Sequence, residues 1–74
     1  MAELKLHEEQ TDDLIDEGFA TVNEAAQYLR MGRSWLYSEM DAGRLAYSRF
    51  GRSRRIPWAA IKQLARDSVV GPTN

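Results

Sequence analysis

Two short apolar stripes at helical spacing, separated by a three-residue break, constrain the fold of this chain more than any other feature. The first stripe recurs at i, i+3, i+4 and i+7 and consists of Val22, Ala25, Ala26 and Leu29. Thr21 and Glu24 precede and overlap it as Thr-x-x-Glu, the capping-box pattern that begins a helix. The run Met31-Gly32-Arg33 breaks the stripe, so the sequence predicts a helix of about two turns that ends near residue 30.

A second short helix is predicted over roughly residues 33–42, with Leu36 and Met40 directed to the core. Gly43 follows it, and glycine ends a helix at little cost because it tolerates positive φ. Two short helices joined by a turn of three to four residues predict a helix–turn–helix, in which the second helix enters the DNA major groove.

A basic β-hairpin and a third helix are predicted after this pair. Residues 46–50 alternate, Gly51-Arg52-Ser53 predicts a turn, and Arg54-Arg55-Ile56 predicts the returning strand. Pro57 suits the start of a helix, where its missing N–H costs nothing. The apolar stripe of that helix consists of Trp58, Ile61, Leu64 and Ala65. The predicted fold class is therefore α+β, mostly α, a winged helix–turn–helix with a two-stranded wing and a C-terminal helix.

In this order of elements, and in its motifs, the chain resembles the excisionase family, small relatives of the MerR-type winged helix. The matching runs are Thr21-Val22-x-Glu24-Ala25-Ala26-x-x-Leu29, Arg33-Ser34-x-Leu36-Tyr37, Gly43-x-Leu45 and Arg49-Phe50-Gly51-Arg52-x-x-Arg55-Ile56-Pro57. The chain departs from the family pattern at Arg30 (usually glycine), Gly32 (usually serine) and Arg54 (commonly aromatic), and at Ser38 and Asp41, where basic residues are frequent.

The resemblance implies a recombination directionality factor of a bacteriophage. Several copies would bind side by side on DNA, bend it, and help a tyrosine integrase to excise a prophage. Double-stranded DNA, neighbouring copies of the chain and the integrase are the implied partners. Two alternatives remain open at this point, a small stand-alone MerR-like transcriptional regulator and a protein-interaction module whose basic wing binds an acidic partner.

Charge is distributed unevenly along the 74 residues, although the net charge is only −1. Residues 1–17 carry seven acids and one lysine, and residues 18–74 carry nine basic residues and four acids. Such an asymmetry between segments favours nucleic acid as the partner of the basic part. We expect an acidic N-terminal segment at 1–19 with a short helix at about 11–17, a DNA-binding domain at 20–68, and a C-terminal arm at 69–74.

Ten side chains are predicted to contact DNA, from the second helix and from the hairpin. They are Arg33, Ser34, Trp35, Tyr37 and Ser38, together with Arg49, Arg52, Ser53, Arg54 and Arg55. Guanidinium groups bind phosphates or guanine edges, hydroxyls bind phosphates or bases, and arginines beside a hairpin tip suit the minor groove.

Some of these residues and their neighbours have alternative roles. Trp35 is expected either to contact a thymine methyl group or sugar, or to cover the edge of the core. Arg55 is expected to contact DNA, with a structural pairing to Asp67 or to an N-terminal acid as the alternative. Glu39 and Asp41 are expected to be exposed surface acids, rather than acids that are neutralised by Arg33 or Arg44 or that bind a cytosine.

Catalysis, cofactors and membranes find no support in the sequence. His7 is the single histidine and there is no cysteine, so no set of metal ligands is predicted. No nucleophile motif or phosphate loop is present. No apolar run approaches the length of a membrane span, and a cytoplasmic protein of the bacterial host cell is therefore expected.

Overall fold

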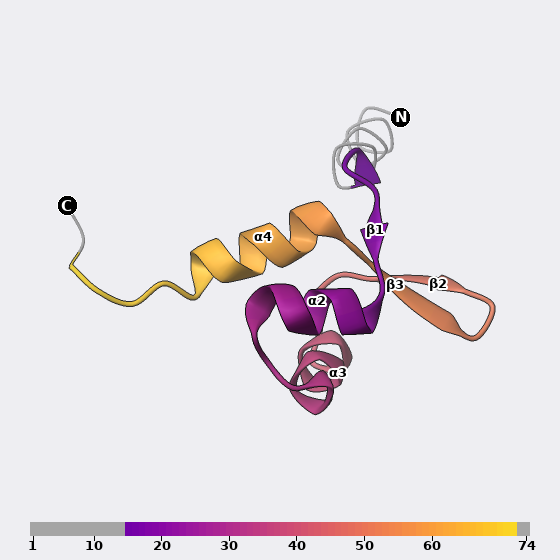
Figure 1. Cartoon of the computed structure of the whole chain (residues 1–74), viewed down its shortest axis with the longest axis horizontal. Helices are drawn as coiled ribbons and strands as arrows, with labels where there is room; N and C mark the ends of the chain where they lie inside the picture. Colours follow the sequence, from indigo (N-terminus) through magenta and orange to yellow (C-terminus); the bar gives the residue numbers. More distant parts are fainter. Residues whose placement is uncertain (1–14, 73–74) are drawn as a thin grey trace, which may run out of the picture.

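The computed structural model describes residues 15–72, which form three helices and a small antiparallel sheet (Figure 1). The elements in chain order are β1 (Phe19–Ala20), α2 (Val22–Leu29), α3 (Arg33–Asp41), β2 (Ser48–Phe50), β3 (Ser53–Pro57) and α4 (Trp58–Asp67). This arrangement confirms the predicted fold class, a mostly helical winged helix–turn–helix. The hairpin of β2 and β3, called the wing below, projects away from the helices on the side opposite α4 (Figure 1).

The start of α2 is fixed by the predicted capping box. The N–H of Glu24 donates to Thr21 Oγ1 at 3.0 Å, and the N–H of Thr21 donates to Glu24 Oε1 at 2.9 Å. Each side chain thereby satisfies a backbone donor that the helix itself leaves without a partner. Val22, Ala25 and Ala26 are buried, as the apolar stripe predicts.

Both helices of the helix–turn–helix end on a residue with positive φ. Gly43 has φ 81°, and the N–H of Arg44 donates to the carbonyl of Glu39 at 2.9 Å, which closes α3 as predicted. Arg30 has φ 58° at the end of α2, where the N–H of Met31 donates to the carbonyl of Ala26. An arginine therefore occupies a left-handed position that glycine takes more readily.

The core lies where α2, α3, α4 and β3 meet. Leu36, Ile56 and Ile61 are fully buried, and each comes from a different element. Leu45, on the segment between α3 and the wing, is 2% exposed. Because the chain has no cysteine to cross-link it, this small apolar cluster has to hold the helices and the sheet together.

The sheet has the strand order β1-β3-β2, so the wing is joined to the body through β3. Phe50 pairs with Ser53, which leaves Gly51 and Arg52 as a two-residue turn. The expectation that Ser53 belongs to the turn is therefore wrong, and β2 begins two residues later than predicted. The short strand β1 was not predicted; Ala20 pairs with Ile56 and thereby ties the start of the helix–turn–helix to the wing.

Helix α4 follows β3 directly, with Pro57 as its N-cap residue. Ala60 and Ile61 are buried, and Trp58 and Leu64 pack partly buried against the core. Trp58 also meets Tyr28 edge-on, with ring centroids 5.5 Å apart. The helix therefore serves as a structural support for α2.

Part of the predicted N-terminal segment lies outside the described residues. Residues 11–14 of the expected helix, the acids before them, His7 and the last two residues of the expected arm belong to that part. Residues 15–19 of the segment are described. Among them Gly18 has φ 86°, and its N–H donates to the carbonyl of Ile15 at 3.0 Å.

Candidate nucleic-acid interface

A basic concavity of about 310 Å³ lies between the first turn of α2, the start of α3 and strand β3. Strand β1 pairs only with Ile56 and Pro57, the last two residues of β3. The earlier residues of β3 therefore have no partner strand on the edge where β1 lies. The lining consists of Thr21, Val22, Asn23, Arg33, Tyr37, Arg52, Ser53, Arg54 and Arg55. It contains four arginines and no acid, so the concavity is suited to an anion.

Six of the ten predicted contact residues are brought together in this lining, from α3 and from the wing. They are Arg33, Tyr37, Arg52, Ser53, Arg54 and Arg55. The other four, Ser34, Trp35, Ser38 and Arg49, lie outside it. Ser34 and Ser38 are exposed on α3, whereas Trp35 is half-buried and packs against the core. Covering the core edge was the second of the two roles expected for Trp35.

Three of the predicted contact arginines are exposed, two near the turn of the wing and one at the start of α3. Arg49 and Arg52 are both exposed, as is Arg33 in the first turn of α3. Within residues 15–72, none of these three side chains takes part in a hydrogen bond or ion pair with another residue. Within this part of the chain, an external anion can therefore reach them without breaking a hydrogen bond or ion pair.

Arg54 is placed differently from the other arginines of the wing. Its guanidinium donates to Asp41 Oδ1 at 3.1 Å and lies over the rings of Tyr37 and Tyr47, at 5.2 and 4.7 Å from their centroids. Only 21% of the side chain is exposed. The structure thus places this predicted contact residue in an internal cluster, at the pair of the wing ladder where Arg54 stands opposite Arg49.

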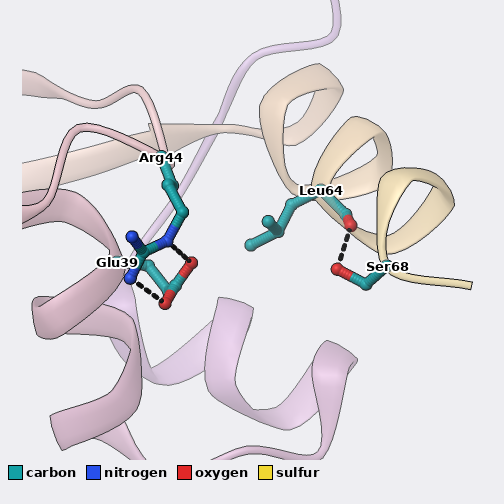
Figure 2. A network of polar contacts seen from close by, with 4 residues as sticks. All are labelled: Glu39, Arg44, Leu64 and Ser68. Carbon is teal, nitrogen blue, oxygen red and sulfur yellow. Dashed lines mark hydrogen bonds and ion pairs between the residues drawn. The ribbon is translucent and has the colours of Figure 1, made fainter.

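The expectation that Glu39 is an exposed surface acid is wrong. Glu39 is 8% exposed and faces Arg44, whose Nε and Nη2 donate to its two carboxylate oxygens at 2.9 and 3.0 Å (Figure 2). These hydrogen bonds lower the pKa of Glu39 from its ordinary value and raise the pKa of Arg44. The structure thus shows the alternative, neutralisation of Glu39 by Arg44.

Arg55 is half-buried, and its Nη1 donates to the neighbouring carbonyl of Arg54 at 3.0 Å. Asp67, the structural partner considered for it, accepts instead from Gln63 Nε2 at 2.7 Å. Arg55 lines the concavity, and no acid of residues 15–72 forms an ion pair with it.

Sequence reasoning missed the part of the concavity that α2 contributes. Thr21 and Asn23 line it together with Val22. The first N–H groups of a helix have no partner within the helix and carry a partial positive charge. The capping box at Thr21 located this helix start in the sequence, but its position beside the wing depends on the pairing of β1 with β3.

A short helix pair with a basic wing beside its second helix defines the winged helix–turn–helix class of DNA-binding proteins. The chain belongs to the family described as the helix-turn-helix domain, whose family model matches residues 21–68. This is a DNA-binding family, and DNA is accordingly the partner of this chain.

The comparison with curated proteins found no match, and the comparison with solved structures found none either. In the part of the chain that the structure describes, no helix has the length and apolar character needed to cross a membrane. The same part contains no cluster of three or more His, Cys, Asp or Glu side chains that could hold a metal ion.

Proposed function

We propose that α3 lies in the DNA major groove while the wing contacts the adjacent backbone and minor groove. Ser34 and Ser38 are exposed on α3, which gives this helix a surface of small polar side chains that fits into the major groove of DNA. Arg49 and Arg52 lie near the end of the projecting wing (Figure 1). Arginine at such a position is attracted by the negative potential of a narrow minor groove.

The acid-free concavity is the observation that carries this proposal. Between α3 and the wing it holds Arg33, Arg52 and Arg55, and residues 21–23 at the start of α2 complete its lining. Charge-assisted hydrogen bonds from guanidinium and amide groups are the usual way in which proteins hold a phosphate. A phosphate of the DNA backbone bound there would fix how α3 enters the groove.

The biological role that fits best is that of an excisionase, a recombination directionality factor. The motif runs that match the excisionase pattern lie within the helix–turn–helix family match, and that family includes excisionase-like proteins. In this role several copies bind adjacent sites, bend the DNA and promote excision by a tyrosine integrase. A sharp bend in a short site costs several kcal/mol, about 1–6 by elastic estimates, which contacts from several copies can offset.

Footprinting of the full chain across a phage attachment region, combined with an excision assay with the integrase, tests this role. The expected result is protection of two or more adjacent sites, slowed migration of circularly permuted fragments, and excision that requires the protein. Binding to a promoter without any effect on excision would contradict the excisionase role and indicate a MerR-like regulator. Failure to retard mixed DNA at low salt would contradict DNA binding and favour the protein-interaction module.

A further inference from the structure

The contacts between the wing and α3 converge on one side chain. Within residues 15–72, Arg54 makes the ion pair with Asp41 of α3 and the cation–π contact with Tyr37 of the same helix. It also lies against Tyr47, on the segment that leads into β2, with its Cζ 4.7 Å from the ring centroid. No other hydrogen bond or ion pair between side chains joins the wing to α3 in these residues.

The place of Arg54 in the strand explains why it turns inward. In the register of the wing Arg54 stands opposite Arg49, two residues before the fully buried Ile56. Side chains two residues apart in a strand lie on the same face, so Arg54 continues the inner face of β3 beyond the core. There, the flat guanidinium is covered by two tyrosine rings, and its edge donates to a carboxylate. This geometry suits arginine and not lysine.

We propose that Arg54 is a positioning residue, which fixes the angle between the wing and α3 and does not itself contact DNA. The wing is otherwise joined to the body through β3, whose last two residues pair with β1, and by the edge-on contact of Phe50 with Phe19 of β1 at 5.5 Å between ring centroids; neither contact involves α3. A tether at the Arg49–Arg54 pair, close to the turn, keeps Arg49 and Arg52 at the distance from α3 that one DNA site requires. This inference rests on the DNA-binding function proposed above.

Substitution of Asp41 tests the proposal, because the proposal and the simplest alternative predict changes of DNA affinity in opposite directions. Asp41 is 65% exposed on α3, so as a simple surface acid it repels the DNA phosphates. Removal of its charge would then strengthen binding. If Asp41 instead holds Arg54 in place, its removal loosens the wing and weakens binding. The two readings predict opposite changes for the same variant.

The experiment measures the affinity of the full chain for its footprinted DNA site by fluorescence anisotropy. We expect D41N to bind about two- to fivefold more weakly, the range set by a partly exposed ion pair. The matched control D16N removes the same charge from an exposed residue before β1 and leaves the affinity within about twofold. The double variant D41N/R54Q binds no more weakly than R54Q alone, because both changes remove the same tether.

The tyrosine contact and the geometry of the complex give independent measurements. Y47F keeps an aromatic face under the guanidinium and retains the affinity, whereas Y47L weakens binding about threefold. Hydroxyl-radical footprints of R54Q lose the backbone protections made by the wing and keep those made by α3. Circular dichroism melts of each variant check that the helices remain folded.

A D41N variant that binds as tightly as the wild type, or more tightly, would overturn the proposal. So would losses of affinity in D41N and R54Q that simply add in the double variant. A footprint of R54Q in which only one phosphate protection disappears would also overturn it, since both results describe a direct DNA contact by Arg54. If the wild-type chain does not bind DNA at low salt, the proposed function fails. If the wild type binds and D41N is unimpaired, only the positioning role fails.

Discussion

Replacement of Arg49 and Arg52 by alanine tests the role of the wing most directly. Both side chains are exposed, and within residues 15–72 neither is engaged in a hydrogen bond or ion pair. The R49A/R52A variant should therefore keep the fold, with a free energy of unfolding within about 0.5 kcal/mol of the wild type. Any loss of DNA affinity then reports on contacts with DNA and not on damage to the domain.

The size of the loss follows from the number of phosphate contacts removed. Each contact contributes about 0.9 to the slope of log K against log salt, so two contacts lower the slope by about 1.8. If the wild type and the variant bind equally at 1 M salt, this difference in slope makes the variant bind about 60-fold more weakly at 0.1 M salt and about ninefold more weakly at 0.3 M salt. The dependence of the loss on salt is as diagnostic as its size.

Fluorescence anisotropy titrations between 0.1 and 0.3 M salt measure both quantities. K62Q/R66Q is the charge-matched control, because it removes two positive charges from α4, where Lys62 pairs with Glu17 at 2.7 Å and Arg66 donates to Gln63. The control should change the affinity by less than about threefold, since removed charges far from the contact surface are screened. Equal losses in the two double variants, or an unchanged slope for R49A/R52A, would refute the assignment of the wing to DNA contact.

Three further predictions concern stability and are measured by urea denaturation. R30G should stabilise the chain by about 0.5 kcal/mol, because glycine relieves the left-handed strain at φ 58°, whereas R30A should give no such gain. T21A should destabilise it by about 1 kcal/mol through loss of the capping box, and T21S should retain most of that stability. E39Q should be less stable than the wild type at pH 7. That difference should disappear in acid, because the stability from ionised Glu39 is present above its ordinary pKa of 4.5 and is lost as the pH falls through its lower folded pKa. A constant difference at all pH values would exclude the ion pair with Arg44 as its cause.

The elements of this fold that depend on local sequence were predictable. The stripe of α2, its capping box and the glycine after α3 each specify a structure within a few residues, and all are confirmed. The turn of the wing was misplaced by one residue, because Gly51-Arg52 and Gly51-Arg52-Ser53 both satisfy a hairpin and only the pairing of Phe50 with Ser53 decides. Strand β1 has two residues, too few for any alternating pattern.

The internal pairings of the arginines could not be predicted, because they depend on tertiary distance. Arg54 and Asp41 are thirteen positions apart, and neither strand nor helix periodicity relates them. Glu39 and Arg44 are five apart, across a helix end whose turn brings Arg44 back over α3. Sequence reasoning therefore found the cluster of basic residues but could not separate the arginines proposed to face DNA from those engaged in internal pairs.

This separation explains how a chain with a net charge of −1 can serve as a DNA-binding domain. The two acids of α3 are both paired with arginines from outside the helix, so neither presents an uncompensated carboxylate to a phosphate. In the interface proposed here, the arginines that no acid of residues 15–72 neutralises are Arg33, Arg49, Arg52 and Arg55. Four contacts per bound copy correspond to a salt slope of about −3.6, whatever the net charge of the chain. Attraction at long range is then weak, and affinity depends on how well the wing and α3 fit one site together. This is why a tether between these two elements matters more here than it would in a uniformly basic protein.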